Sequence, residues 1–289
     1  MDLVKYLIIN EEDKKLGFNI LHGGHNLIQP NEPYPMPEHP ENYKFKWEKG
    51  RRLNEYQAIY IINGKGVFES ESAGMRRINS GSIILLFPDE WHRYKPSIST
   101  GWNEYWFGFS GVFADRLMEY KFIRKDSPVL HIGFNEKLFR LYADLIEIIK
   151  SEPPGNQMIA AGVAVQIIGT ANRFIREKQF DGKEIEELIK KSRLMLIADL
   201  ENPESPKEIA QKLNLGYSWY RKMFKRYTGL APGQFQMQHR INRARELLAN
   251  QSYTIKEISG MLGFESNFHF SKTFKLKTGM TPGQFRRNI

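Results

Sequence analysis

Residues 228–235 read TGLAPGQF, and residues 278–285 read TGMTPGQF, so six of the eight letters recur fifty positions later. The flanking sequence repeats as well, because the Lys-Glu-Ile of 207–209 returns at 256–258. A glycine that ends one helix and a proline that begins the next commonly separate two helices. The duplication therefore predicts a small helical unit that is built twice, and this unit decides the fold of the last third of the chain.

Each copy predicts a helix-turn-helix. A short helix begins near Pro206 or Ile255 and carries apolar residues four positions apart, which places them on one face. The following turn contains Asn214 in the first copy and Gly263 in the second, and these residue types enter a left-handed backbone conformation most easily. A second helix with a buried aromatic face then ends at the glycine of the repeated octet.

The free face of each second helix predicts contact with nucleic acid. It holds hydrogen-bond donors, cations and flat rings without a carboxylate, whereas an ordinary solvated face, the alternative, mixes both charges. Side chains near the start of such a helix reach base edges in the major groove, and cations farther along hold phosphates. We expect these residues to contact DNA: Ser218, Trp219, Arg221, Lys222, Lys225, Asn267, Phe268, His269, Ser271 and Lys272.

The charge of the chain is unevenly distributed. It has 42 Lys+Arg and 33 Asp+Glu, a net charge of +9. Residues 1–182 hold 23 of each sign, so the remaining 19 basic and 10 acidic residues place the whole excess in residues 183–289. A polyanionic partner is the expected consequence, although a domain can also simply be basic. Cysteine is absent, which excludes disulfides, thiolate zinc sites and a cysteine nucleophile.

A long helix is expected between the two units. Residues 233–251, GQFQMQHRINRARELLANQ, have apolar residues at helical spacing. A helix of about 17 residues spans roughly 25 Å, so it can hold two reading helices about one DNA turn apart. A helical solenoid is the other explanation of a repeat, but a solenoid needs at least three units and this chain shows two.

On these residues, segment 184–289 resembles the DNA-binding domain of the AraC/XylS family along its whole length, most specifically over RINRARELLANQSYTIKEISGMLGFESNFHFSKTFKLKTGMTPGQFR. The resemblance implies a transcription regulator, usually an activator acting as a homodimer. It implies an operator in double-stranded DNA and RNA polymerase as partners, and no cofactor. The family more often has a small or polar residue where Phe268 stands, so contact there would be apolar.

The front of the chain predicts a β-structure. From Tyr56 it runs in short apolar pieces, EYQAIYIING, GKGVFES, GSIILLFP and EYWFGF, separated by turn signals such as the one at Gly64-Lys65-Gly66, which we expect to form a hairpin turn. Residues 51–111 resemble the cupin-like effector domain of sugar-responsive members of the same family. We expect an α+β protein: a cupin-like β-barrel over 1–133, a helical dimerisation and linker region over 134–182, and an all-α domain with two helix-turn-helix units over 183–289.

An effector site is expected in this barrel. A sugar presents an apolar CH face and a rim of hydroxyls, so its site needs a flat aromatic side chain and fixed polar groups. The resemblance supports Arg51, with Arg52 as its alternative, together with Tyr94 and Trp106. The other interpretation is that the tryptophans are core and the arginines surface. The expected effector-binding residues are Trp47, Arg51, Arg52, His92, Tyr94, Glu104 and Trp106.

Other functions are disfavoured by the motifs. Enzymes of the cupin type bring two closely spaced histidines, a carboxylate and a later histidine to a metal, and His22, His25, His39, His92 and His131 do not show that spacing. We expect His22 and His25 in a loop, no metal and no enzymatic activity. Residues 156–172 carry no charge but are short and polar for a membrane span of roughly 20 residues, which favours a buried helix.

Residues 134–182 predict two apolar helices around Pro153-Pro154. In the resembling family such helices pair two subunits; the alternative is that they only pack on their own barrel. With no export signal at the N-terminus, we expect a cytoplasmic, effector-responsive regulator without membrane contact. The resemblance implies that it activates genes of carbohydrate use. The alternative function is a constitutive DNA-binding regulator whose front domain only dimerises.

Overall fold

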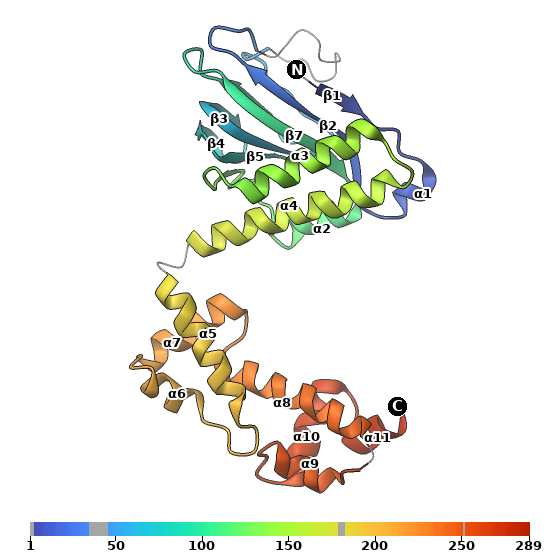
Figure 1. The fold of residues 1–289 in the computed structure, drawn as a ribbon, viewed down its shortest axis with the longest axis vertical. Coiled ribbons are helices and arrows are strands. Elements are labelled where there is room, and N and C mark those ends of the chain that lie inside the picture. The colour runs from blue at the N-terminus through green and yellow to red at the C-terminus, as the bar shows by residue number, and fades with distance from the viewer. Residues whose placement is uncertain (1–2, 35–45, 179–182, 251) are drawn as a thin grey trace. The chain divides into compact units, whose positions relative to one another are not determined.

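The computed structural model describes residues 3–34, 46–178, 183–250 and 252–289. The chain forms two compact units, Met1–Gln179 and Phe180–Ile289 (Figure 1). The expected boundary after residue 182 falls at the edge of a segment outside the described residues. Each unit has hydrophobic cores of its own, so the two are described separately.

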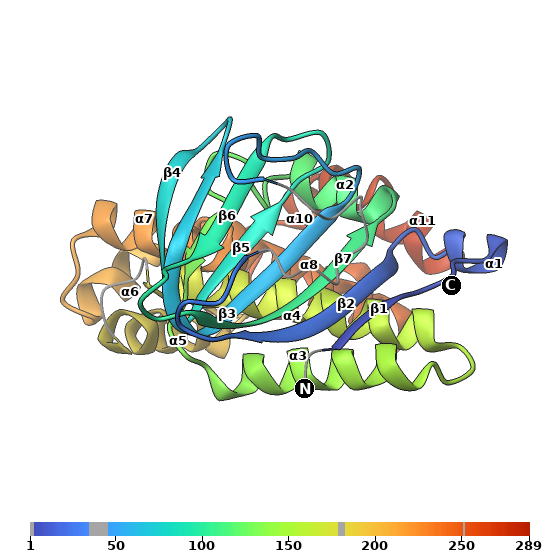
Figure 2. The same ribbon diagram turned by 90° about the horizontal axis from the view of Figure 1, so that it is seen from above.

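The first unit is an antiparallel sheet that curls into an open barrel and carries helices on one outer face (Figure 2). The strands run in the order β1-β2-β7-β3-β5-β8, and β4 and β6 pair with the far half of β3. The elements are β1 Leu3–Tyr6, α1 Glu11–Lys14, β2 Asn19–Ile28, β3 Tyr56–Ser70, β4 Gly74–Asn79, β5 Ser82–Leu86, β6 His92–Pro96, β7 Trp102–Ser110, α2 Val112–Glu119, β8 Val129–His131, α3 Glu136–Ser151 and α4 Asn156–Lys178.

The prediction of a hairpin turn at Gly64-Lys65-Gly66 is wrong. β3 continues through this triplet, with a shift of register against β7 between Ile61 and Asn63 and a positive φ of 99° at Gly64. β3 pairs with β5 through Ile61 and with β7 through Gly64, and it pairs with β4 and β6 from Lys65 and Gly66 onward. The glycine therefore lets one strand bend from one half of the barrel into the other, because a residue without Cβ tolerates this conformation.

Alternation along the strands separates two faces. Tyr56, Ala58 and Tyr60 of β3 point to an outer face that α3 and α4 cover in both views of the ribbon. Ile59 and Ile61 point inward, where they meet a second core containing Phe68 and the two buried tryptophans of β7. The period of two thus gives the barrel a helix-covered outside and an inside partly lined with polar groups.

α4 is tied into the first unit through a buried amide. Gln157 is 2% exposed, and its side chain accepts a hydrogen bond from Ile20 N at 3.0 Å and donates one to Ile20 O at 2.8 Å. In the described part of the chain, Asn156–Arg176 is the one helix long and apolar enough to cross a membrane by length and composition, a test that core helices also pass. The bonds of Gln157 to β2 fit a core helix.

The second unit is all helical and contains both predicted helix-turn-helix units. α6 and α7 form the first, α9 and α10 the second, and α8 runs between them (Figure 1). Asn214 and Gly263 have φ values of 55° and 62° in the two turns, as expected. The helices are α5 Lys183–Ala198, α6 Pro206–Lys212, α7 Tyr217–Thr228, α8 Pro232–Ala249, α9 Ile255–Met261, α10 Asn267–Thr278 and α11 Pro282–Arg287.

The repeated octet acts as predicted. Gly229 and Gly279 end α7 and α10 in the left-handed conformation, and each backbone N–H donates to the carbonyl four residues earlier at 2.8 Å. Pro232 and Pro282 occupy the first turns of α8 and α11. Local sequence alone therefore sets these helix ends.

Candidate functional site

The reading face of the second unit is built on α7 and α10. Tyr220 and Phe224 of α7 are fully buried, as are Phe270 and Phe274 of α10, so the helical period leaves the other sides free. Nine of the ten expected DNA-contacting residues are exposed, and Ser271 is half-buried. Tyr217, 42% exposed at the start of α7, was missed by the sequence reasoning and extends the same face.

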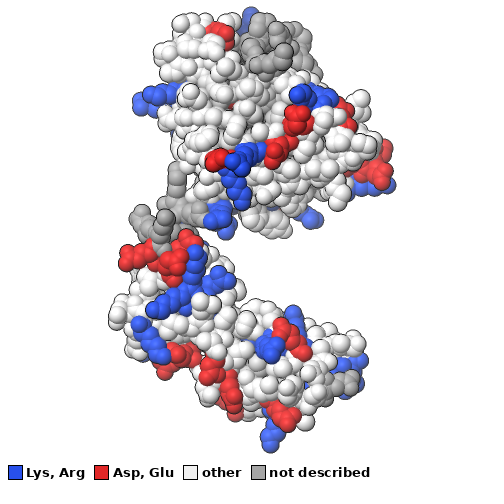
Figure 3. All heavy atoms as spheres, viewed as in Figure 1, with Lys and Arg blue, Asp and Glu red and all other residues white. Residues whose placement is uncertain are grey.

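Positive charge predominates on these two helices. α7 contains four Lys and Arg residues and α10 three Lys, and neither contains Asp or Glu. In Figure 3 the acids of the second unit gather over the start of α5 and the connection from α5 to α6. Glu265, just before α10, lies 3.8 Å from His269. The excess positive charge is thus concentrated on the helices whose faces are free, which suits contact with phosphates.

α8 fixes both units through two buried polar side chains. Gln236 donates to the carbonyls of Leu196 and Glu204 at 3.1 and 2.9 Å, next to the first helix-turn-helix unit. Arg240 donates from Nε to Leu262 O at 2.7 Å in the turn of the second helix-turn-helix unit. Its guanidinium lies 4.1 Å from the Phe264 ring centre. Sequence reasoning missed both, because only the tertiary structure brings these partners together.

The barrel interior collects five of the seven expected effector-binding residues. Arg51, His92, Tyr94, Glu104 and Trp106 come from the segment before β3 and from β6 and β7. His92, Tyr94, Glu104 and Trp106 are buried, and Arg51 is half-buried. Inward positions of antiparallel strands thus bring together residues up to 55 positions apart in the chain.

Arg51, His92 and Tyr94 form one hydrogen-bonded group. Arg51 donates to Tyr94 Oη at 2.6 Å and from Nε to His92 Nε2 at 3.3 Å. His92 Nδ1 donates to the Glu90 carbonyl at 3.0 Å, so the ring is held as the neutral tautomer. Burial, with the adjacent Arg51 charge, lowers the pKa of His92 to about 3. The group therefore presents one permanent cation beside neutral rings.

Next to it lie buried polar atoms without partners. Asn26 and Glu104 are paired across β2 and β7, with Trp102 at the neighbouring inward position. Asn26 Oδ1, Trp102 Nε1 and Glu104 Oε2 are buried and make no hydrogen bond of good geometry among the described residues, although Trp102 and Tyr34 lie close enough to Glu104 to oppose the rise of its pKa. Burial raises the pKa of Glu104 to about 8, against smaller opposing effects of Asn26, Trp102 and Arg51. Such unpaired groups are costly, so they point to a ligand or water that satisfies them.

Glycines make room for the large interior rings. A Cβ on Gly24 would lie 2.5 Å from the Trp106 indole, and one on Gly66 would lie 2.5 Å from the Trp102 ring. Both rings therefore lie close against the backbone of a neighbouring strand. Their orientation is fixed by this contact, because neither ring can move toward that strand.

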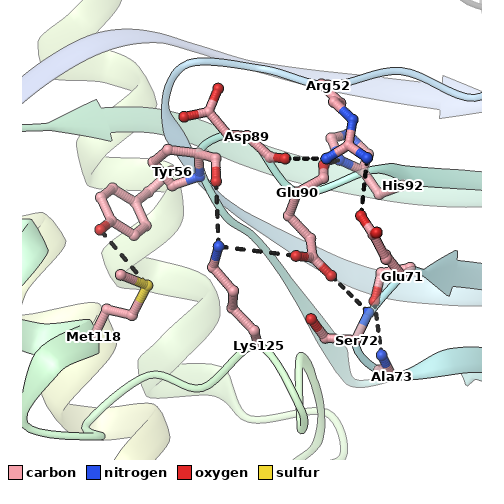
Figure 4. Close-up of polar contacts among 12 residues, drawn as sticks. Arg52, Tyr56, Glu71, Ser72, Ala73, Asp89, Glu90, His92, Met118 and Lys125 are labelled. Carbon is pink, nitrogen blue, oxygen red and sulfur yellow. Dashed lines mark hydrogen bonds and ion pairs between the residues drawn. The ribbon is translucent and has the colours of Figure 1, made fainter.

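Two of the expected effector-binding residues lie outside the interior. Arg52 pairs with Glu71 at 2.9 Å and donates to the Asp89 carbonyl, as Figure 4 shows. Trp47 packs on the outer side of β6, with Arg93 and Lys95 4.4 and 4.2 Å from its ring centres. Neighbouring residues of an extended chain point to opposite faces, which is why Arg51 enters and Arg52 does not.

A second buried polar group was missed by the sequence reasoning. His22 Nε2 lies 2.5 Å from Glu55 Oε1, and Gln57 Nε2 donates to the same oxygen at 2.7 Å. The prediction that His22 and His25 lie in a loop is wrong, because both lie in β2. Over the described ranges no cluster of three or more His, Asp or Glu could hold a metal ion; His39 lies outside those ranges.

Two helix-turn-helix units on one rod, joined in sequence to a barrel with a partly polar interior, are the architecture of a DNA-binding protein with a ligand-binding domain. Comparison with protein families agrees: "AraC-like ligand binding domain" matches residues 37–168, and "Helix-turn-helix domain" matches residues 180–288. The chain belongs to the AraC family of DNA-binding transcription regulators.

Several curated regulators are similar over most of their length. The HTH-type transcriptional regulator YidL of Escherichia coli is 26% identical over 92% of this chain and 84% of its own. The Msm operon regulatory protein of Streptococcus mutans is 26% identical over 82% and 85%. The raffinose operon regulator RafR of Pediococcus pentosaceus is 23% identical over 86% and 90%. A solved AraC-type regulator from Chromobacterium violaceum, 29% identical, covers 37% of this chain and 96% of its own with a TM-score of 0.34.

Proposed function

We propose that this protein is an effector-responsive transcription activator of carbohydrate-utilisation genes, acting in the cytoplasm as a homodimer that binds an operator and engages RNA polymerase. Its effector is a neutral sugar or polyol bound inside the barrel. The names of relatives support this class: RafR serves a raffinose operon, and a protein of Staphylococcus xylosus, 23% identical over 73% of this chain, is a lactose operon transcription activator.

The observation that carries the effector proposal is the set of three buried polar atoms on Asn26, Trp102 and Glu104 that make no hydrogen bond of good geometry among the described residues. An indole N–H needs an acceptor, an amide oxygen needs a donor, and a carboxyl that is largely protonated at neutral pH offers both. A hydroxyl group both donates and accepts, so a molecule with several hydroxyls satisfies this set without introducing a charge. Trp106, 7% exposed, supplies the flat apolar surface beside it.

The dimer proposal rests on α4. Met158, Ile159, Gly162, Gln166 and Gly169 are exposed and fall on one helical face. No Asp, Glu, Lys or Arg occurs between Glu152 and Arg173. Added Cβ atoms at both glycines would meet open space. An uncharged face of this length suits a second copy of the chain, which presents the same face.

The effector proposal is tested by thermal-shift screening of the full-length protein against sugars and polyols, followed by titration with the molecule that stabilises it. Trp106→Ala should weaken binding about tenfold or more, because the stacking surface is lost. Arg52→Ala, a matched change outside the interior, should leave the dissociation constant unchanged. Equal dissociation constants for wild type, Trp106→Ala and Arg51→Ala, with folding verified by circular dichroism, would place the effector elsewhere.

A further inference from the structure

The two reading helices can be compared position by position. α7 and α10 each have twelve residues and lie fifty positions apart. Their buried aromatics coincide at this offset, Tyr220 with Phe270 and Phe224 with Phe274. Each exposed residue of α7 therefore has a structural counterpart on α10, because both helices are anchored by the same two core positions.

The helices differ in their first turns and share two lysines farther along. Lys222 and Lys225 of α7 return as Lys272 and Lys275 of α10, so the positions suited to phosphates are the same. Earlier positions carry different chemistry. The pairs are Tyr217 with Asn267, Ser218 with Phe268, Trp219 with His269, and Arg221 with Ser271.

On α10 the reading chemistry is apolar and amide. Phe268 is 77% exposed although two other phenylalanines of the same helix are fully buried. A ring held in water at the start of a reading helix suits the C5-methyl of thymine, and the adjacent Asn267 amide matches the edge of adenine. His269 faces the Phe264 ring edge-on at 5.7 Å and lies near Glu265, which draws it away from this role.

On α7 the reading chemistry is cationic. Arg221 is exposed, and α7 itself contains no acidic residue to pair with it. Its planar fork of N–H donors matches O6 and N7 of guanine, the acceptors on that base in the major groove. The half-buried Ser271 at the corresponding position of α10 cannot make this bidentate contact.

We infer that the two halves of the operator differ in composition: α7 reads a guanine through Arg221, and α10 reads an A·T pair through Asn267 and the contact of Phe268 with the thymine methyl. The inference rests on the DNA-binding function of the chain and assigns its sequence preference. Because the two lysines suited to phosphates are shared, we assign the preference to the first turns, where side chains reach base edges.

The first experiment selects operators from a random duplex pool with the full-length protein. The preferred duplex is then remade with uracil for single thymines, which removes only the methyl group, and with 7-deazaguanine for single guanines, which removes N7. Wild type should lose about threefold to tenfold in affinity at one thymine and about tenfold at one guanine, measured by fluorescence anisotropy at fixed salt.

Variants assign each loss to its side chain. Phe268→Ala should bind the thymine and uracil duplexes equally, whereas Leu276→Ala, an exposed apolar side chain farther along α10, should keep the wild-type difference. Arg221→Gln should not distinguish guanine from 7-deazaguanine but should keep the methyl effect. Equal wild-type binding to every substituted duplex, or the same losses in the variants as in wild type, would overturn the inference. Failure to select any duplex would instead contradict DNA binding itself.

Discussion

Glu104 and His92 illustrate how the barrel interior treats single charges. Both are buried, and burial disfavours the charged form of each. The pKa of the acid is raised to about 8 and that of the base is lowered to about 3, so both groups are largely neutral at pH 7. Arg51 remains as a cation at this site, so a ligand there would meet one positive charge among neutral polar groups.

Glu104 should make the N-terminal unit, Met1–Gln179, less stable as pH rises. Its folded pKa lies above its unfolded value, so its stabilising effect is complete below about pH 4.5 and is lost as pH rises toward 8. Glu104→Gln removes this dependence, and its free energy of unfolding relative to wild type should rise between pH 5 and 8.5 by an amount on the order of a few kcal/mol.

Urea unfolding followed by tryptophan fluorescence checks this prediction. A Trp219→Phe background leaves four tryptophans, and all of them lie in the N-terminal unit. His92 acts in the opposite sense, since its depressed pKa makes the fold lose stability as pH falls below about 6.5, and its effect is shared by both proteins. Parallel pH profiles for wild type and Glu104→Gln would show that the carboxyl is not held neutral.

Among the secondary-structure elements, the two helix-turn-helix units have separate cores. Tyr220 and Phe224 pack with α5 and α6, whereas Phe270 and Phe274 pack with α9 and the second half of α8. The rod α8, with Gln236 and Arg240, contacts both cores, and Leu200 of the connection from α5 to α6 packs against the second. Damage to one core should therefore remain local.

Phe224→Ala should lower the stability of the first helix-turn-helix unit, formed by α6 and α7, by about 3–5 kcal/mol, because a fully buried ring is replaced by a cavity. Native-state hydrogen exchange should show loss of protection in α6 and α7 and retained protection in α9 and α10. Phe274→Ala should give the reverse pattern, and the exposed change Lys225→Ala should alter neither. Equal loss over both units after either change would mean that they unfold together.

The exposed face of α4 gives a prediction about assembly. Ile159 is 52% exposed on the uncharged face, so Ile159→Arg should place an unpaired charge in the proposed dimer contact and shift the protein toward monomer. Analytical ultracentrifugation measures the shift. Glu147→Arg on the exposed side of α3 is the control, and dimers of unchanged strength in Ile159→Arg would exclude this face.

At the scale of the whole molecule, an effector-responsive regulator must couple its two sites. If saturating effector changes operator affinity by some factor, saturating operator must change effector affinity by the same factor. We expect a factor of about 5–150, measured by operator titration with and without the stabilising sugar and by the converse titration. A factor of one in both directions would favour the constitutive regulator, whose front unit only dimerises.

Features set by one residue or its neighbours in the chain could be predicted from the sequence, whereas features set by contacts between distant segments could not. The turns at Asn214 and Gly263 were predicted because backbone strain depends on the residue itself. Gly64 was read as a hairpin because its local signal is the same for a turn and for a strand that bends; pairing with four other strands decides between them. The first two strands carry no comparable turn signals, and they were missed.

The sequence by itself determined the duplicated helical unit, its capping residues and the charge of its reading helices, since helix ends and periodicity are local properties. Only the tertiary structure decided which candidate effector residues meet. Arg51 joins Tyr94 and His92 inside the barrel, while Arg52 turns to Glu71 outside it. The physical reason is that a strand sends successive side chains to opposite faces, and which face is the interior depends on strands distant in the chain.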